Sequence, residues 1–117
     1  MPIFVKMLSP HEVLKTYWGF DDFRSSQLDV IHSILEGNDT LVLLPTGGGK
    51  SICYQLPALL LDGITLVVSP LIALMKDQVD ILQARNFPAA RLDSTLSAEE
   101  TRALYQDLDS NKIKLLY

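Results

Sequence analysis

The fold of this chain is decided by one stretch, Thr40-Leu41-Val42-Leu43-Leu44-Pro45-Thr46-Gly47-Gly48-Gly49-Lys50-Ser51. An apolar run of the β type stops at a proline and gives way to three glycines, a lysine and a serine. Glycine lacks Cβ, so the backbone can adopt positive φ and bring several N–H groups around one anion. The order predicts a buried strand, a phosphate-binding loop, and a helix whose positive N-terminal end faces the anion.

Each polar residue of this stretch has a role in such a loop. Lys50 supplies a point charge for the β- and γ-phosphates of a nucleotide, and Ser51 supplies a hydroxyl for Mg²⁺. The strict pattern G-x-x-x-x-G-K-[ST] fits Gly49-Lys50-Ser51, but Leu44 occupies its first glycine position. The alternative is a glycine-rich turn that only links a strand to a helix. The flanking strand and helix favour the phosphate loop, with Thr46, Gly47 and Gly48 as further phosphate-binding candidates.

Length and composition predict one globular domain. The chain has 117 residues, of which 48% are hydrophobic and 21% charged. It has no apolar run of the roughly 18 residues that a membrane span needs, and its first residues lack the pattern of a signal peptide. Cys53, the single cysteine, can form no internal disulfide and is predicted to be a small buried apolar residue. A cytoplasmic protein is expected.

The net charge of the chain is negative. Ten Lys+Arg against 14 Asp+Glu give −4 and a pI near 4.9, whereas proteins that coat DNA carry a broad basic surface. The charge leaves room for a nucleic-acid strand that is held by a few local contacts.

Two helices are expected before the phosphate loop. Ser9-Pro10-His11-Glu12 predicts a capping box that opens a helix towards Tyr17, and Gly19 ends it. Ser25 or Ser26 is expected to cap a second helix with one apolar face, before Gly37. The residues of that face are Leu28, Ile31, Ile34 and Leu35. His11 and His32 have no second ligand at metal spacing, so both are interpreted as ordinary helical residues.

Strands and helices alternate after the loop. Ile52 to Leu61 predicts a helix that Pro57 kinks or splits. Residues 64–68 have no polar face, which predicts a strand covered on both sides. The remaining expected elements are a helix capped by Ser69-Pro70 and running to about Arg85, a strand from Ala89 to Leu92, a helix opened by the capping box Ser97–Glu100, and a strand from Lys112 to Tyr117. The pattern predicts an α/β domain with a mainly parallel sheet.

The connection between the first two helices, Trp18 to Gln27, is rich in aromatic and donor groups. The Gln27 amide carries a donor and an acceptor that match the N6 and N7 edge of adenine. Arg24 and Phe20 offer flat faces that can lie against a purine ring. The alternative is a simple helix connection in which Phe20 and Phe23 pack.

Three motifs of the chain resemble those of known helicases. Leu-Pro-Thr-Gly-Gly-Gly-Lys-Ser resembles the phosphate loop of superfamily 2 helicases, in which the leading glycine is commonly replaced. Gly-Phe-x-x-Phe-Arg-x-x-Gln, placed ahead of it, resembles the adenine-recognition motif of the RecQ family of DNA helicases. The resemblance implies that Phe20 sandwiches the base, Arg24 stacks on it and Gln27 reads adenine.

The third motif, Ser69-Pro70-Leu71-Ile72-Ala73-Leu74-Met75-Lys76-Asp77-Gln78, resembles the RecQ segment that contacts single-stranded DNA. Ser69, Pro70 and Lys76 are therefore candidates near the DNA backbone, although spacing alone describes only a strand-to-helix junction. Asp93-Ser94-Thr95 stands where the family has a further strand-contacting motif, and the residues by themselves predict a loop.

The resemblance implies the N-terminal part of a RecQ-type ATP-dependent DNA helicase with a P-loop (RecA-like) fold. Residues of about 9–37 would be a helical adenine-recognition segment, and residues 38–117 the P-loop portion of the first motor domain. ATP and Mg²⁺ are the implied cofactors, and single-stranded and partly duplex DNA the implied partners. The family couples hydrolysis to 3′-to-5′ unwinding in DNA repair and recombination, in the cytoplasm or at a bacterial nucleoid.

Parts of the catalytic machinery are expected elsewhere. No acidic pair follows a hydrophobic strand in this sequence, and the family's Asp-Glu-x-His motif lies downstream of Tyr117, as does the second motor domain with its arginine finger. The resemblance also places the sheet neighbours of the 41–44 strand beyond Tyr117, so apolar strand edges are expected to stay unpaired. The 117-residue chain alone is therefore expected to be inactive.

Two other functions remain open from the sequence. A different P-loop enzyme, such as a small kinase, would bind nucleotide without any role for Phe20, Arg24 and Gln27. A non-catalytic nucleotide-binding product is the other alternative.

Overall fold

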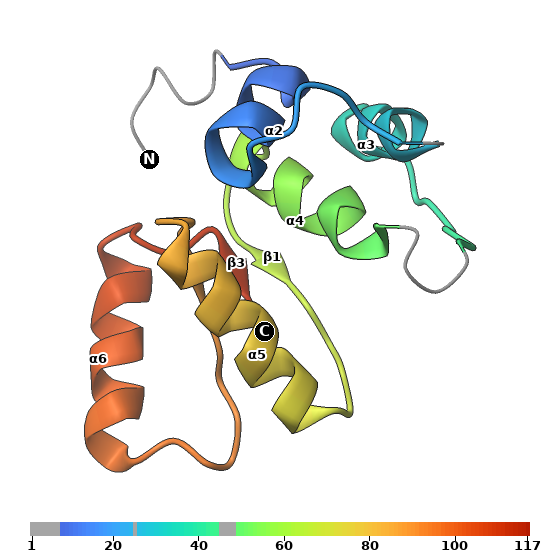
Figure 1. Cartoon of the computed structure of the whole chain (residues 1–117). Helices are drawn as coiled ribbons and strands as arrows, with labels where there is room; N and C mark the ends of the chain where they lie inside the picture. Colours follow the sequence, from blue (N-terminus) through green and yellow to red (C-terminus); the bar gives the residue numbers. More distant parts are fainter. Residues whose placement is uncertain (1–7, 25, 45–48) are drawn as a thin grey trace. The chain divides into compact units, whose positions relative to one another are not determined.

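The structure is a computed structural model that describes residues 8–24, 26–44 and 49–117 (Figure 1). The chain divides into two compact units, of which one extends to Asp62 and the other covers Gly63–Tyr117. They are called the N-terminal unit and the C-terminal unit below, and each is described by itself.

The N-terminal unit is a group of helices. It contains α2 (Pro10–Trp18), α3 (Gln27–Leu35) and α4 (Lys50–Leu60). Helix α4 contacts both α2 and α3, so it forms the centre of the unit. The buried apolar residues come from all three helices: Val13, Leu14, Ile31, Cys53, Leu56, Ala58 and Leu59.

Local sequence signals set the ends of α2 as predicted. The Ser9 hydroxyl accepts from the Glu12 N–H at 3.2 Å, and the Glu12 carboxylate accepts from the Ser9 N–H at 3.4 Å, which completes the capping box. Gly19 ends the helix in the left-handed conformation with φ 76°. Helix α3 begins at Gln27, and Ser26 precedes it without a side-chain capping bond, while Ser25 lies outside the described residues.

Helix α4 is continuous through Pro57, so of the predicted kink or split, the split does not occur. Proline has no N–H and cannot donate to the carbonyl one turn before it. The helix continues because its second half is buried apolar surface, which includes Leu56, Pro57, Ala58 and Leu59. The Pro57 carbonyl still accepts from the Leu61 N–H at 2.9 Å.

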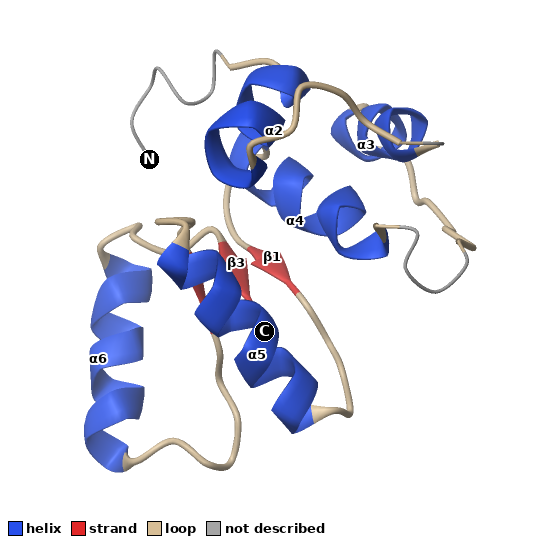
Figure 2. Ribbon diagram, in the orientation of Figure 1, coloured by secondary structure: helices blue, strands red, loops and turns tan. Residues whose placement is uncertain are grey.

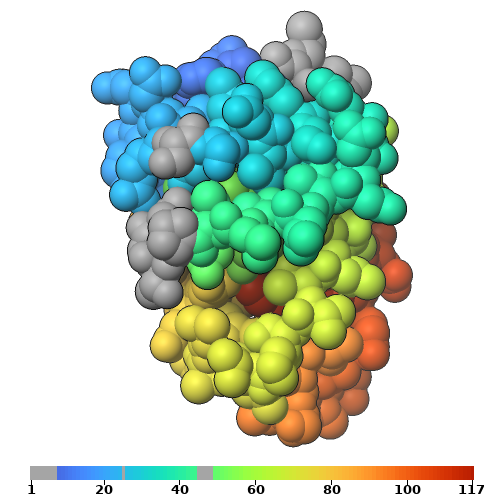
Figure 3. All heavy atoms as spheres, turned by 90° about the vertical axis from the view of Figure 1, so that its right-hand side faces the viewer, coloured from blue at the N-terminus to red at the C-terminus, as the bar shows by residue number. Residues whose placement is uncertain are grey.

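The segment 41–44 is not the buried strand that was predicted. Leu41 and Leu43 are 86% and 85% exposed, and the segment joins no ladder with a strand of the described residues. It lies on the surface of its unit (Figure 3). The apolar run has the composition of a strand, but a strand forms only where another strand offers its backbone, and none of the described strands does so here.

The C-terminal unit contains a three-stranded parallel sheet in the order β1-β3-β2. Figure 2 labels β1 and β3 of this sheet. The strands are β1 (Thr65–Leu66), β2 (Ala89–Ala90) and β3 (Leu115–Leu116). Thr65 and Ala89 both stand opposite Leu115, so the central strand comes last in the chain. Parallel pairing on both sides confirms the prediction of an α/β unit with a parallel sheet.

Two helices accompany this sheet, α5 (Ile72–Ala84) and α6 (Ala98–Asp109). Helix α5 buries Met75, Val79 and Leu82. Leu104 of α6 packs with Ala90 and Ile113 of the strand region. The predicted capping box Ser97–Glu100 is present, with bonds of 3.1 and 3.0 Å. The Tyr117 hydroxyl donates to Gln78 Oε1 at 2.7 Å and ties the last strand to α5.

Two further expectations in this unit are corrected. Residues 64–68 are not covered on both sides, because Leu66 and Val68 are 68% and 97% exposed and β1 is an edge strand of this sheet. Ser69 does not cap α5, which begins at Ile72 after Leu71. The Ser69 hydroxyl instead accepts from the Leu71 N–H at 3.2 Å, a local turn that competes with the helix for this side chain.

Candidate nucleotide site

The last glycine of the predicted phosphate loop stands directly before α4. Gly49 is the N-cap residue of the helix and has φ 77°, a left-handed conformation that glycine adopts without strain. The other predicted loop residues, Thr46, Gly47 and Gly48, lie outside the described residues.

Lys50 and Ser51 form the first turn of α4. The Lys50 side chain is exposed and makes no ion pair with a carboxylate of the described residues, while Ser51 is half-buried. The first backbone N–H groups of a helix have no partner within the helix, and the helix dipole places partial positive charge there. A cation and the positive end of the helix dipole thus gather at one point, which suits a phosphate group.

Gln27 links this turn to the connection between α2 and α3. Its side chain is 2% exposed, and both ends of its amide are bonded. Oε1 accepts from the Arg24 N–H at 2.8 Å, and Nε2 donates to the Gly49 carbonyl at 3.0 Å. A primary amide has two hydrogens and two lone pairs, so one hydrogen and one lone pair remain for a ligand.

Close packing at Gly49 gives a second reason for glycine. A Cβ atom at this position would lie 2.2 Å from Gln27 Nε2 and 3.1 Å from Arg24 Nη2. The structure therefore brings two of the predicted adenine-binding residues, Arg24 and Gln27, against the end of the phosphate loop. Gln27 and Gly49, which are in contact, are 22 positions apart in the sequence.

Phe20, the third predicted adenine-binding residue, lies on the loop that follows α2 and is 55% exposed. Arg24, at the other end of the same loop, is exposed as well. Between them, Asp21 pairs with Lys15 of α2 and Asp22 contacts His11 of α2. These contacts were not predicted from the sequence. The signal that could have indicated them is the acidic pair Asp21-Asp22, together with two basic residues, His11 and Lys15, that are one helical turn apart.

A cavity of about 270 Å³ opens beside the first two turns of α4. It is lined by Ile34, Thr40, Val42, Lys50, Cys53 and Tyr54. None of the predicted adenine-binding residues lines it, so it is separate from the candidate base site. Cys53 is buried, and burial raises the pKa of its thiol. The thiol is therefore a poor nucleophile, which agrees with the prediction that Cys53 is a small buried apolar residue.

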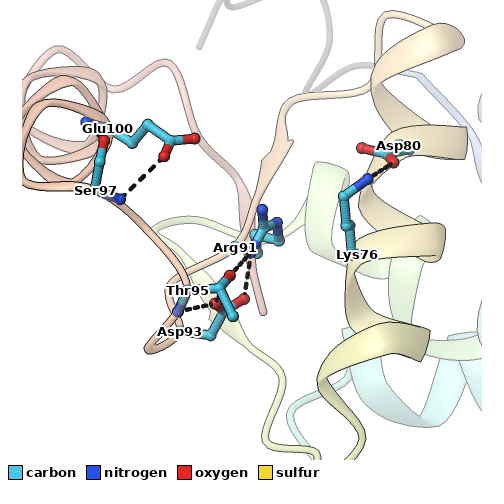
Figure 4. Close-up of polar contacts among 7 residues, drawn as sticks. All are labelled: Lys76, Asp80, Arg91, Asp93, Thr95, Ser97 and Glu100. Atoms are coloured by element: carbon cyan, nitrogen blue, oxygen red, sulfur yellow. Dashed lines mark hydrogen bonds and ion pairs between the residues drawn. The ribbon is translucent and has the colours of Figure 1, made fainter.

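The predicted DNA-contacting residues lie in the C-terminal unit and make local contacts. The Ser69 hydroxyl is engaged by Leu71, and Pro70 is exposed. Lys76 Nζ lies 2.8 Å from Asp80 Oδ2, one turn further along α5 (Figure 4). Lys76 is more than half exposed, so its ammonium group is accessible from solvent.

Asp93 organises the loop between β2 and α6 (Figure 4). Its Oδ1 accepts from the Thr95 N–H at 2.8 Å and from the Thr95 hydroxyl at 2.5 Å, and its Oδ2 accepts from Arg91 Nη1 at 2.5 Å. Arg91 Nη1 also donates to Thr95 Oγ1 at 3.0 Å. Hydrogen bonds from Thr95 and Arg91 lower the pKa of Asp93 to about 2.

The lowered pKa of Asp93 gives a prediction for acid stability. The ionised form is favoured in the folded state, so Asp93 contributes stability that is fully present above about pH 4, the ordinary range of an aspartate, and is lost as the pH falls towards 2. Asp93→Asn keeps an oxygen for Thr95 but presents no charge to Arg91. We expect the Tm difference between wild type and Asp93→Asn to be largest above pH 4 and to shrink towards pH 2. A Tm difference that is independent of pH over this interval would contradict it.

The described part of the chain has neither a candidate metal cluster nor a membrane-spanning helix. It contains no group of three or more His, Cys, Asp or Glu that could hold a metal ion. None of its helices has the length and apolar character needed to cross a membrane.

Comparison with known proteins gives consistent similarities. The sequence model of the DEAD/DEAH box helicases matches residues 24–117. The chain is 55% identical to the ATP-dependent DNA helicase RecQ of Synechocystis over 93% of this chain and 23% of that protein. It is 51% identical to the RecQ helicase of Haemophilus influenzae over 90% of this chain and 17% of that protein. It is 50% identical to ATP-dependent DNA helicase Q5 of Rattus norvegicus over 89% of this chain and 11% of that protein.

Proposed function

Because this chain belongs to the DEAD/DEAH box helicase family, we propose that it is the ATP-binding part of an ATP-dependent DNA helicase of the RecQ type. Identities of 50–55% to three RecQ-type helicases support the subfamily. The chain spans only 11–23% of the length of these relatives, so unwinding belongs to the proposal for a complete protein that contains it.

One observation carries the proposal for ATP: the Gln27 amide bonds to the carbonyl of Gly49. The residue proposed to read the base is thereby in direct contact with the residue that starts the phosphate-binding turn. This contact would hold the proposed base site next to the proposed phosphate loop. A nucleotide needs the two sites side by side, because its base and its phosphates belong to one molecule. A P-loop protein that binds only the phosphates has no need of this contact.

In the proposed complex, the protein holds the nucleotide at two ends. Thr46, Gly47, Gly48, Gly49 and Lys50 would bind the phosphates, since backbone N–H groups and an ammonium group are the donors that phosphate oxygens require. The Ser51 hydroxyl would be a ligand of Mg²⁺, an ion that is commonly held by few protein groups together with nucleotide phosphates.

The base would lie between Phe20 and Arg24, two exposed residues at the ends of the loop, with its N6 and N7 edge towards Gln27. The remaining hydrogen of Nε2 would donate to N7, and the remaining lone pair of Oε1 would accept from N6. Gln27 is buried and Arg24 Nη2 lies close to Gly49, so the base would enter beside the Arg24 guanidinium group.

Lys50 is the proposed catalytic residue of this chain. During hydrolysis, negative charge develops on the transferring phosphoryl group, and a positive side chain fixed beside it lowers the barrier. We assign residues of about 9–37 to adenine recognition and residues 38–117 to the P-loop portion of a RecA-like motor domain. The acidic residues that orient water and Mg²⁺ would come from other parts of the complete protein.

Single-stranded and partly duplex DNA is the proposed macromolecular partner, with movement in the 3′-to-5′ direction and a role in repair and recombination. Ser69, Pro70 and Lys76 would lie at the DNA backbone. Lys76 would exchange Asp80 for a phosphate, which costs little because an exposed ion pair contributes about 0.2–1 kcal/mol. A protein of this kind would act where the DNA is, in the bacterial cytoplasm or at the nucleoid.

Two alternatives make different predictions. Another P-loop NTPase would use Gly49 to Ser51 but would not depend on Phe20, Arg24 or Gln27. A non-catalytic nucleotide-binding fragment would bind ATP with the base preference proposed here, and no complete protein containing it would turn ATP over.

The isolated 117-residue chain is expected to bind ATP without hydrolysing it appreciably and without unwinding DNA. The sequence holds Lys50 but no acidic pair after a hydrophobic strand, and hydrolysis needs both. The measurement is phosphate release with and without single-stranded DNA, alongside equilibrium binding of a fluorescent ATP analogue. DNA-stimulated turnover by the purified chain would contradict this prediction.

A further inference from the structure

The loop that carries Phe20 and Arg24 is held against α2 by three consecutive residues. Lys15 Nζ lies 2.5 Å from Asp21 Oδ1. His11 Nε2 lies 3.3 Å from Asp22 Oδ1, within hydrogen-bonding distance. The ring of Phe23 meets the His11 ring edge to face, with the centroids 4.9 Å apart and the planes at 74°. Both candidate base-contacting residues of the loop therefore flank an anchored segment.

His11 and Lys15 share one face of α2. They are four residues apart, which is about one helical turn, and both are exposed. The buried residues Val13 and Leu14 of the same helix belong to the core of the N-terminal unit. The loop is thus anchored to the solvent side of a helix whose other side is fixed by packing. The Lys15 side chain, through its hydrogen bond and its charge, also lowers the pKa of Asp21.

We propose that His11 and Lys15, called the α2 bracket below, are positioning residues that hold the 20–24 loop in the shape that receives the nucleotide base. The inference rests on the proposed function, in which Phe20 and Arg24 flank adenine. The bracket residues themselves need not touch the nucleotide. His11 was interpreted from the sequence as an ordinary helical residue, and only the contacts of Asp21, Asp22 and Phe23 give it and Lys15 a role.

The physical reason is preorganisation. A flexible loop loses conformational entropy when it closes on a ligand, and that loss weakens binding. A loop that is already anchored at three successive residues has less entropy to lose. Loss of one exposed ion pair is expected to weaken binding only about 1.5- to fivefold, because such pairs are weak in water. The effect should therefore be measured on a variant that removes both bracket residues.

The test uses the complete protein with two probes, ADP and pyrophosphate, whose binding is measured by calorimetry. Both probes occupy the phosphate loop, but only ADP has a base. In the double variant His11→Ala/Lys15→Ala, we expect the Kd of ADP to rise about three- to tenfold, as two weak anchors together allow, and the Kd of pyrophosphate to stay unchanged. Equal weakening of both probes would mean a general loss of folding of the N-terminal unit and would overturn the proposal.

A charge exchange supplies the second variant. Lys15→Asp places two carboxylates together and should weaken ADP binding, whereas Lys15→Asp/Asp21→Lys restores an opposite pair and should recover it. Recovery of ADP binding would support a positioning role, because binding would then depend on a pair of opposite charges at positions 15 and 21 and not on a particular residue at either position. Failure of the exchange to recover binding would overturn the role of the Lys15–Asp21 pair. Lys112→Ala is the control, since it removes an exposed cation that lies outside every proposed site and should change neither probe.

Phe20→Ala separates this inference from the proposed function. If Phe20→Ala weakens ADP but not pyrophosphate while the bracket variant changes neither, the base site stands and the bracket is overturned. If Phe20→Ala leaves ADP binding unchanged, the proposed base site fails and the bracket fails with it. Hydrogen exchange of the amides of residues 20–24 gives an independent readout, and it should become faster in the double bracket variant.

Discussion

Replacing Lys50 by alanine in the complete protein is expected to lower kcat for ATP by at least about 100-fold, the usual cost of losing one group that stabilises transition-state charge. Lys50 stands at the first position of α4 and is exposed, without an ion-pair partner among the described carboxylates. Its ammonium group is therefore available to a phosphate. Alanine is a good helix former, so α4 should persist and the loss should be confined to the charge.

The control for this prediction is a lysine of the same exposure elsewhere. Lys112, which follows α6 in the C-terminal unit, is exposed and lies outside every site proposed above. Lys112→Ala should leave ATP turnover unchanged, and Lys50→Ala should retain single-stranded DNA binding, because no DNA contact is assigned to Lys50. Near-normal turnover by Lys50→Ala would show that the phosphate-loop assignment is wrong.

Features with local causes could be predicted from the sequence. Both capping boxes, Ser9–Glu12 and Ser97–Glu100, are present because each is completed within four residues. The same holds for Gly19, whose left-handed conformation ends α2 regardless of what the helix packs against. Parallel pairing also followed from the alternation of strands and helices, which forces the chain to return in the same direction.

Features that depend on distant partners could not be predicted in the same way. From their composition alone, the apolar runs at 41–44 and 64–68 were expected to be covered, yet Leu43 and Val68 are almost fully exposed. Only the resemblance, which places the sheet neighbours of the 41–44 strand beyond Tyr117, predicted unpaired edges there. Composition shows that a segment can be a buried strand, but burial depends on which other strand lies beside it. Pro57 shows the opposite case, because tertiary burial keeps α4 continuous where local propensity predicted a break.

The roles of the candidate-site residues were predicted from the resemblance, whereas the contacts between these residues became visible only in the structure. Arg24 and Gln27 are only three residues apart, but Gly49 lies 22 positions after Gln27, and no periodicity relates it to them. The resemblance to RecQ motifs assigned a base-reading role to Gln27, but it did not reveal that both ends of the Gln27 amide are bonded within the protein. The contacts of Asp21, Asp22 and Asp93 likewise depend on geometry that motifs do not encode.

The bonding of Gln27 changes what its removal should do. Alanine at this position leaves the Arg24 N–H and the Gly49 carbonyl without their side-chain partner, and a typical hydrogen bond contributes about 0.5–1.5 kcal/mol. Part of that cost falls on Gly49, the last glycine of the proposed phosphate loop, which every nucleotide would use. We therefore expect Gln27→Ala to weaken the use of GTP as well as ATP, by a factor common to both.

Loss of the contact to adenine should weaken the use of ATP further, beyond the weakening that ATP and GTP share. Adenine offers a donor at N6 and an acceptor at N7, which the spare lone pair and hydrogen of Gln27 match, while guanine has an acceptor at O6 in place of the donor. A good bidentate contact contributes about 1–3 kcal/mol of discrimination, or roughly five- to 150-fold. The ratio of kcat/KM for ATP to that for GTP cancels the common factor and isolates this term.

In the complete protein with saturating single-stranded DNA, Gln27→Ala is expected to lower the ATP-to-GTP ratio of kcat/KM by about five- to 150-fold. Gln27→Glu is the matched variant: it keeps an oxygen for the Arg24 N–H but replaces the donor to Gly49 and to N7 by a second oxygen, so it should lose the preference as well. Gln55→Ala is the control, because Gln55 is buried on α4 in the same unit and no base contact is assigned to it. If the ratio stays unchanged in both Gln27 variants, Gln27 serves only to connect the 20–24 loop to Gly49. The chain would then bind nucleotide through its phosphates, as a P-loop protein without base recognition does.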